Sequence, residues 1–143
     1  MKPYKMPEKD RTKGVCWRYA LACILEVNPK KIPDFVHKHP EKYLLKTREW
    51  LDEKYGKGMV FIPINQFMET SHRFNPSGGP LGHSIMIIDT KDEDENHAVI
   101  AFNGCLLFDP AENDHDFFTV PLGFFVIYRC TWPPCQARPP SPR

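Results

Sequence analysis

Three residues that lie far apart in the chain are of types that together perform acyl transfer. Cys16 stands near the start of the strongest helix pattern in the sequence, Gly14 to Leu25. His97 opens an apolar strand, and Asp109 ends the strand that follows it. A thiolate is a strong nucleophile, a histidine can serve as its base, and an acid can hold the imidazole in one tautomer. The sequence therefore predicts a catalytic Cys16–His97–Asp109 set, provided that the fold brings the three side chains together.

Each of these residues also has a structural interpretation. A lone cysteine is more often a small buried hydrophobe, and this is our prediction for Cys23, seven residues further along the same helix. His83 opens another strand after a glycine-rich loop, so it is a rival to His97 as the base. Asp109 precedes a proline, and an Asp-Pro pair commonly ends a strand without any further role.

A predicted hairpin connects the histidine to the acid. Asn103-Gly104 is the strongest short hairpin signal in the chain. Counting outward from this turn pairs residue 102 with 105, 100 with 107 and 98 with 109. Asp109 is then diagonal to His97, and a β-bulge could bring the two side chains to one face of the sheet.

The remaining patterns predict helices first and an antiparallel sheet afterwards, which is an α+β arrangement. Helices are expected at 14–26, 32–36 and 41–54, and strands at 59–63, 83–89, 97–102, 105–109 and 124–130. Residues 64–69 fit a strand or a helix, and 70–82 form the main loop. We expect a single domain over residues 1–131, followed by a proline-rich tail, 132–143, that is disordered or lies along the surface.

Composition and charge are those of an ordinary globular protein. The chain has 143 residues, of which 41% are hydrophobic and 26% charged, and its net charge is +1. This balance does not favour a nucleic-acid or a membrane partner, and no apolar run approaches the roughly 18 residues of a membrane span. The first residues are charged and contain prolines, unlike a signal peptide. Five cysteines without a C-x-x-C pair favour free thiols, so we expect the reducing cytoplasm.

The order of motifs resembles that of small papain-like cysteine hydrolases and peptidase-like proteins of bacteria and their phages. The similarity spans about residues 10 to 111. Its motifs are Gly14-x-Cys16-x-Arg18-x-x-x-Ala22-x-Ile24-Leu25, Ile32-Pro33-x-Phe35, Trp50-Leu51, Asn96-His97-Ala98-Val99 and Leu107-Phe108-Asp109-Pro110.

This resemblance implies a papain-like fold in which the nucleophile helix packs on an antiparallel sheet. It implies that Cys16 is the nucleophile, His97 the general base and Asp109 the residue that orients the base. The reaction would be hydrolysis or transfer at an amide, isopeptide or thioester carbonyl of a protein or peptide-like substrate, without a cofactor or a metal.

The chain departs from the family pattern just before the nucleophile. Papain-like enzymes usually place a glutamine about six residues before the cysteine as an oxyanion donor, and this chain has Asp10 there. An ionised Asp10 would repel a developing oxyanion. The Cys16 amide, together with Arg11, Thr12 or another backbone amide, would then have to bind the oxyanion.

Two alternatives follow from these observations. One is a catalytically weak or inactive papain-like binding module, such as a phage-encoded inhibitor or adaptor, whose proline-rich tail docks on a protein partner. The other is a metal site made by Cys16, His83, His97 and Cys105. These ligand types suit zinc, but no two of them have the short spacing typical of zinc sites.

Overall fold

The computed structural model describes residues 1–12, 14–64, 79–89, 96–112 and 121–130. Its helices are α1 (Val15–Leu25), α2 (Phe35–Lys38) and α3 (Tyr43–Tyr55), with short 3-10 helices η1 (Glu8–Asp10) and η2 (Pro29–Lys31). Its strands are β1 (Lys57–Pro63), β2 (His83–Asp89), β3 (Asn96–Phe102), β4 (Cys105–Phe108) and β5 (Pro121–Arg129). The predicted α+β class is confirmed. Three predicted segments lie wholly or largely outside the described residues: the tail 132–143, most of the main loop 70–82 and nearly all of 64–69.

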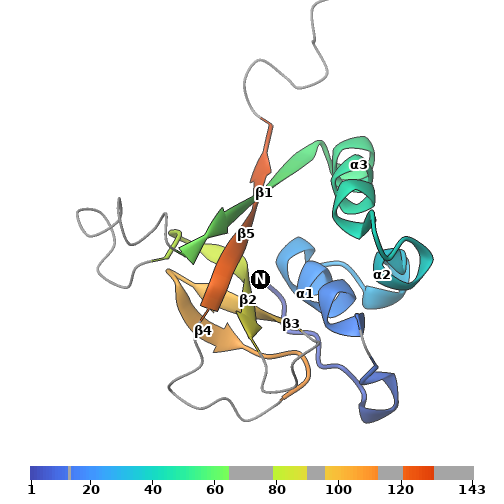
Figure 1. Ribbon diagram of the computed structural model, residues 1–143, viewed down its shortest axis with the longest axis horizontal. Helices are drawn as coiled ribbons and strands as arrows, with labels where there is room; N and C mark the ends of the chain where they lie inside the picture. The colour runs from blue at the N-terminus through green and yellow to red at the C-terminus, as the bar shows by residue number, and fades with distance from the viewer. Residues whose placement is uncertain (13, 65–78, 90–95, 113–120, 131–143) are drawn as a thin grey trace, which may run out of the picture.

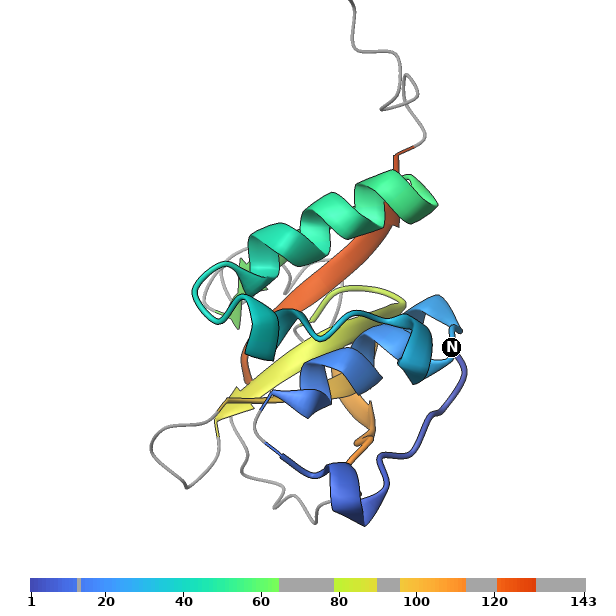
Figure 2. The same ribbon diagram turned by 90° about the vertical axis from the view of Figure 1, so that its right-hand side faces the viewer.

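The five strands form one antiparallel sheet in the order β1-β5-β2-β3-β4 (Figure 1). The last strand, β5, is inserted between β1 and β2; it pairs with β1 over residues 123–129 and with β2 over residues 121–125. Figure 2 shows the three α-helices gathered on one side of the sheet, where α1 packs on β2 and β3 and α3 packs on β1. The helix that carries Cys16 therefore lies directly against the strand that carries His97.

The buried face of α1 provides the central part of the core. Leu21, Ala22 and Cys23 are fully buried and belong to the same cluster as Ile85 and Ile100 of the neighbouring strands. The prediction that Cys23 is a core residue is confirmed. Burial of this apolar stripe fixes the rotation of α1 about its axis, and with it the direction in which Cys16 points.

The second helix was predicted two to three residues too early. The prediction placed Pro33 in its first turn, but α2 begins at Phe35 and ends at Lys38. The cause is Asp34, whose carboxylate accepts a hydrogen bond from the His37 amide at 3.3 Å and so caps the helix. The third helix ends as predicted, because Gly56 takes up the left-handed conformation, with φ of 58°.

The hairpin between β3 and β4 contains the β-bulge on which the site prediction depends. Both turn residues have positive φ, 50° at Asn103 and 81° at Gly104, as a tight hairpin turn requires. The register pairs Phe102 with Cys105, but Ile100 pairs with Phe108. The predicted pairing of residue 100 with 107 is therefore wrong, because one extra residue is accommodated in β4.

Candidate active site

Cys16 lies in the first turn of α1 and is half-buried. The helix begins after Gly14, which has φ of 82°. A Cβ atom at Gly14 would lie 2.5 Å from Cγ1 of Val36, so this glycine is needed for α2 to pack against the start of α1. Val36 of α2 thus occupies the space beside Gly14.

His97 and Asp109 are in direct contact. His97 Nε2 lies 2.8 Å from Asp109 Oδ1, and the two side chains are only 12% and 5% exposed. A short contact between a histidine and a carboxylate in such a buried setting is strengthened by the low local dielectric. The acid therefore fixes the orientation of the imidazole ring and keeps a proton on Nε2.

The Asp109 carboxylate is itself held by the chain around it. Oδ1 of this carboxylate accepts a second hydrogen bond, from the Ala111 amide at 2.8 Å. The backbone carbonyl of Asp109 accepts one from the Glu112 amide at 3.0 Å. The Pro110 carbonyl accepts a hydrogen bond from the Met6 amide at 2.7 Å. The loop after β4 is thus closed by a local turn and anchored to the N-terminal segment, so the acid has little freedom to move.

Cys16 completes the set through the other side of the imidazole. Burial lowers the pKa of His97, but hydrogen bonds with Asp109 and Cys16, together with the charges of both, raise the pKa to about 9. Because Asp109 takes Nε2, Nδ1 is the ring nitrogen left for the Cys16 sulfur. At neutral pH the ring is an imidazolium that can stabilise a neighbouring thiolate. The structure thus brings together Cys16, His97 and Asp109.

The rival histidine lies elsewhere. The His83 ring packs against Phe102, with ring centroids 4.8 Å apart. The pKa of Glu26, at the C-terminal end of α1, is lowered mainly by the N-terminal ammonium group and to a lesser degree by the charge of His83. His83 is therefore close to the end of α1 that is remote from Cys16, and the structure does not bring it to the thiol.

The four ligands of the metal hypothesis lie in two separate groups, Cys16 with His97 and Cys105 near His83. Cys105 begins β4 next to the hairpin turn and is exposed, on the same side of the fold as His83. Among the residues that the structure describes, no group of three or more His, Cys, Asp or Glu side chains could hold a metal ion.

Asp10 occupies the sequence position at which papain-like enzymes usually carry the glutamine. Its Oδ2 accepts a hydrogen bond from the Tyr19 hydroxyl at 3.3 Å. Burial raises the pKa of Tyr19, and the charge of Asp10 and this hydrogen bond raise it further. The carboxylate is thereby tied to a residue one helical turn after Cys16, which restrains the charge that we expected to oppose an oxyanion.

The start of α1 offers backbone donors in place of the glutamine. Among the described residues no side chain caps this end of the helix, and the Val15 amide donates a hydrogen bond to the Thr12 carbonyl at 3.2 Å. The amide of Cys16 belongs to the first turn, where helix amides have no partner within the helix. Arg11 and Thr12, the side chains considered from sequence, are both exposed.

Tyr43 is a neighbour of the site that sequence reasoning did not find. Its ring packs edge-on against Trp17, with centroids 5.9 Å apart, and both Tyr43 and Cys16 pack against the same core cluster. Burial raises the pKa of Tyr43, and the charge of Cys16 raises it further. No local pattern in the sequence connects Tyr43, the first residue of α3, to the start of α1.

None of the described helices combines the length and the apolar character needed to cross a membrane. Comparison with known proteins found no relative: no family model, curated protein or solved structure matches the chain.

Proposed function

We propose that this chain is a thiol-dependent hydrolase or acyl transferase with a papain-like arrangement, acting at an amide, isopeptide or thioester carbonyl of a protein or peptide-like substrate. The observation that supports it best is the placement of His97 between Asp109, at 2.8 Å from Nε2, and Cys16. A buried imidazole with a raised pKa, held between a carboxylate and a thiol at a helix start, is the arrangement that thiol catalysis requires.

The reaction would proceed in two stages. The Cys16 thiolate attacks the carbonyl carbon and forms an S–C bond, while the carbonyl electron pair moves onto oxygen and is stabilised by the Cys16 amide at the start of α1. The imidazolium of His97 then donates its Nδ1 proton to the leaving group, whose bond to carbon breaks. In the second stage, His97 takes a proton from water or from an acceptor amine, which attacks the thioester carbon. The S–C bond then breaks and releases the Cys16 thiolate, which restores the starting imidazolium–thiolate pair.

Competitive alkylation tests the proposal without knowledge of the substrate. At pH 7, with a limiting amount of iodoacetamide, we expect Cys16 to react faster than the exposed Cys105, because a paired thiolate is the reactive species. Peptide mass spectrometry gives the extent of labelling at each cysteine. Labelling of Cys105 at the same rate as Cys16, or faster, would sink the proposal.

The presence of Asp10 favours a second candidate function, that of a papain-like binding module with little or no turnover. A carboxyl group, bonded to the Tyr19 hydroxyl of α1, stands at the sequence position where papain-like enzymes have an oxyanion donor. The readout is release of nitrophenol from an activated aryl ester. Turnover beyond one equivalent of nitrophenol that is lost in Cys16→Ala supports the enzyme. A burst of at most one equivalent, with Cys16 still selectively alkylated, supports the binding module.

A further inference from the structure

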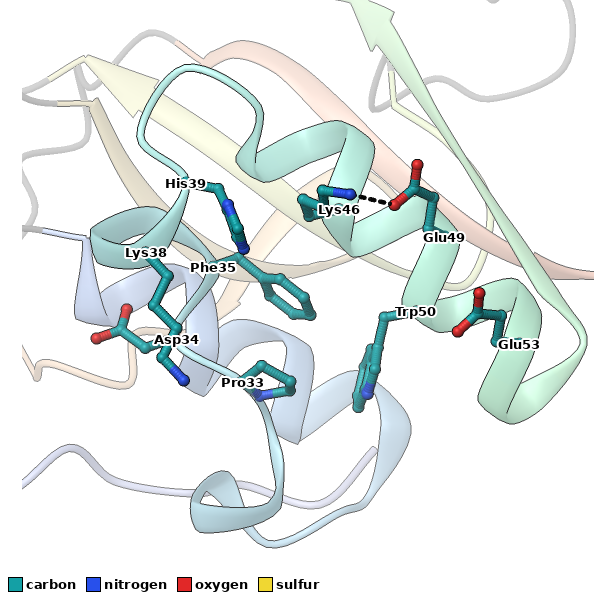
Figure 3. Close-up of a pocket in the computed structure, with 9 residues that line it drawn as sticks. All are labelled: Pro33, Asp34, Phe35, Lys38, His39, Lys46, Glu49, Trp50 and Glu53. Carbon is teal, nitrogen blue, oxygen red and sulfur yellow. Dashed lines mark hydrogen bonds and ion pairs between the residues drawn. The ribbon is translucent and has the colours of Figure 1, made fainter.

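A cavity of about 310 Å³ lies between α2 and α3 (Figure 3). None of the three site residues lines it. Pro33, Phe35 and Trp50 supply its apolar surface, and charged side chains from both helices surround them. A volume of this size is at the lower end of the range for ligand pockets and suits one large side chain.

The apolar surface of the cavity is held in place by aromatic contacts. Phe35 is only 6% exposed, and its ring meets that of Trp50 edge to face, with centroids 5.6 Å apart. On its other side Trp50 packs against Tyr55 at 5.2 Å, with Lys54 Nζ 5.7 Å from its ring centroid. The cavity is therefore preformed, and an apolar group entering it would not have to reorganise the protein.

Two charges at the cavity remain without an ionic partner among the described residues. Most of the charged lining residues are neutralised locally, as in the 2.8 Å ion pair between Lys46 and Glu49. Lys38 and Glu53 have no such partner, and Figure 3 shows them on opposite sides of the apolar surface. A complementary ligand thus has an apolar centre, with a negative group on one side and a positive group on the other.

The cavity is also connected to the nucleophile helix. Val36, on the same short helix as Phe35, packs against Gly14 at the start of α1. Asp34, which lines the cavity, pairs with Arg18 Nη2 at 3.5 Å, two residues after Cys16. A ligand in the cavity is separated from the start of α1 by the single turn of α2.

We propose that this cavity anchors a large apolar side chain of a polypeptide substrate, with an acidic neighbour facing Lys38 and a basic neighbour facing Glu53. The proposal rests on the proposed function, since it supplies a docking position across the single turn of α2 from the start of α1. A polypeptide fits these features because an apolar residue between two residues of opposite charge has the three groups in the required order.

The test measures peptide binding to the full chain carrying Cys16→Ala, by fluorescence polarisation of labelled, end-capped peptides. Three peptides share a central Phe and differ only in the two residues that flank it, with the sequences Asp-Phe-Lys, Asp-Phe-Asp and Lys-Phe-Lys. We expect the mixed peptide to bind best. Trp50→Ala should weaken its binding by tenfold or more, as expected for the loss of a buried aromatic anchor.

Charge reversal at the two unpaired residues gives the sharper readout. Lys38→Glu should shift the preference toward Lys-Phe-Lys, and Glu53→Lys toward Asp-Phe-Asp, each by about threefold, the effect of a partly exposed ion pair. Lys31→Glu, on η2 outside the cavity, is the matched control and should leave the preference unchanged. A misfolded variant would lose binding of all three peptides and would not exchange one preference for another.

Two results would overturn the proposal. One is that the three peptides bind with equal affinity to the Cys16→Ala chain and to both of its charge-reversal variants. The other is binding of free phenylalanine as tightly as the mixed peptide, which would point to a small zwitterionic ligand. Because Cys16→Ala cannot turn over, this test is independent of the alkylation test, and selective alkylation of Cys16 without peptide binding would remove only the cavity proposal.

Discussion

The two ends of α1 carry the same residue type in opposite environments. Cys16, in the first turn, is half-buried and hydrogen-bonds the imidazole of His97. Cys23, near the last turn, is fully buried, and its sulfur accepts a hydrogen bond from the Tyr4 amide at 3.3 Å. Burial raises the pKa of the Cys23 thiol, which keeps it neutral and unreactive. The position on the helix and the nearest polar group, not the residue type, separate a reactive thiol from a structural one.

A single segment contacts both the C-terminal end of this helix and the loop that carries Asp109. The N-terminal residues run alongside α1 (Figure 2), with the Lys2 amide bonded to the Cys23 carbonyl at 3.1 Å and the Met6 amide bonded to the Pro110 carbonyl at 2.7 Å. The same short segment thus donates a hydrogen bond to the backbone of the structural cysteine and fixes the loop that carries Asp109. Stability at one end of α1 and orientation of the acid at the other end are coupled through it.

Replacement of each cysteine by alanine is the strongest test of this difference. Cys16→Ala should reduce aryl ester hydrolysis by about 10³-fold or more, to the background rate, since it removes the nucleophile. Cys23→Ala should leave the rate within about twofold but lower the free energy of unfolding by about 1–2 kcal/mol, because it leaves a small void and removes the acceptor of the Tyr4 amide. Hydrolysis assays and urea titrations measure the two effects. A fully folded Cys23→Ala protein without activity would contradict the comparison.

Replacement of the two histidines extends the test to the base. The pKa of His97, raised from 6.5 to about 9, means that its ring keeps the second proton through neutral pH and loses it near pH 9. The imidazolium therefore supports fast alkylation of Cys16 at pH 7, and His97→Ala should slow it by about 10²-fold.

The control variant is His83→Ala, which removes an imidazole near the opposite end of α1. At every pH from 6 to 9, Cys16 in this variant should be alkylated at the same rate as in the unmutated chain. Equal losses of rate in His97→Ala and His83→Ala would show that the site has been assigned to the wrong histidine.

The sequence predicted those parts of the fold and site that depend on local patterns. The apolar spacing of α1, the strand that begins at His83 and the Asn103-Gly104 turn are all encoded within a few residues, and all were found. The candidate site residues came from the same signals. A helix start marks Cys16, and the hairpin relates His97 to Asp109.

The features that were missed depend on contacts between distant segments. Nothing local indicates that β5 is inserted between β1 and β2, that Val36 fills the space at Gly14, or that Tyr43 lies near Cys16. The early prediction of α2 has a different cause. Proline at 33 favours a first helical turn, but the Asp34 side chain caps the helix one residue later.

Asp109→Asn tests the acid while preserving its turn. The amide oxygen of asparagine can still accept the hydrogen bond from the Ala111 amide, so the loop should keep its shape. Loss of the negative charge should lower the pKa of His97 from about 9 toward its ordinary value, because two of the contributions that raise it come from Asp109. Histidine NMR titration measures this shift, and alkylation of Cys16 at pH 7 should slow by about tenfold. Asp52→Asn, on the exposed face of α3, is the control, and an unchanged titration of His97 in Asp109→Asn would exclude the acid from the site.

The smallest effect is expected at the link between Asp10 and Tyr19. Tyr19→Phe removes the hydroxyl that donates to the Asp10 carboxylate at 3.3 Å, and it should lower the free energy of unfolding by about 1 kcal/mol. It also releases the carboxylate near the start of α1, so the hydrolysis rate should fall by about twofold if the charge can then approach the oxyanion. Asp10→Asn removes the charge and keeps an acceptor for Tyr19, so it should spare the rate, as should the double variant Tyr19→Phe/Asp10→Asn. A rate loss in Tyr19→Phe that persists in the double variant would mean that Tyr19 acts through packing of α1 and not through restraint of Asp10.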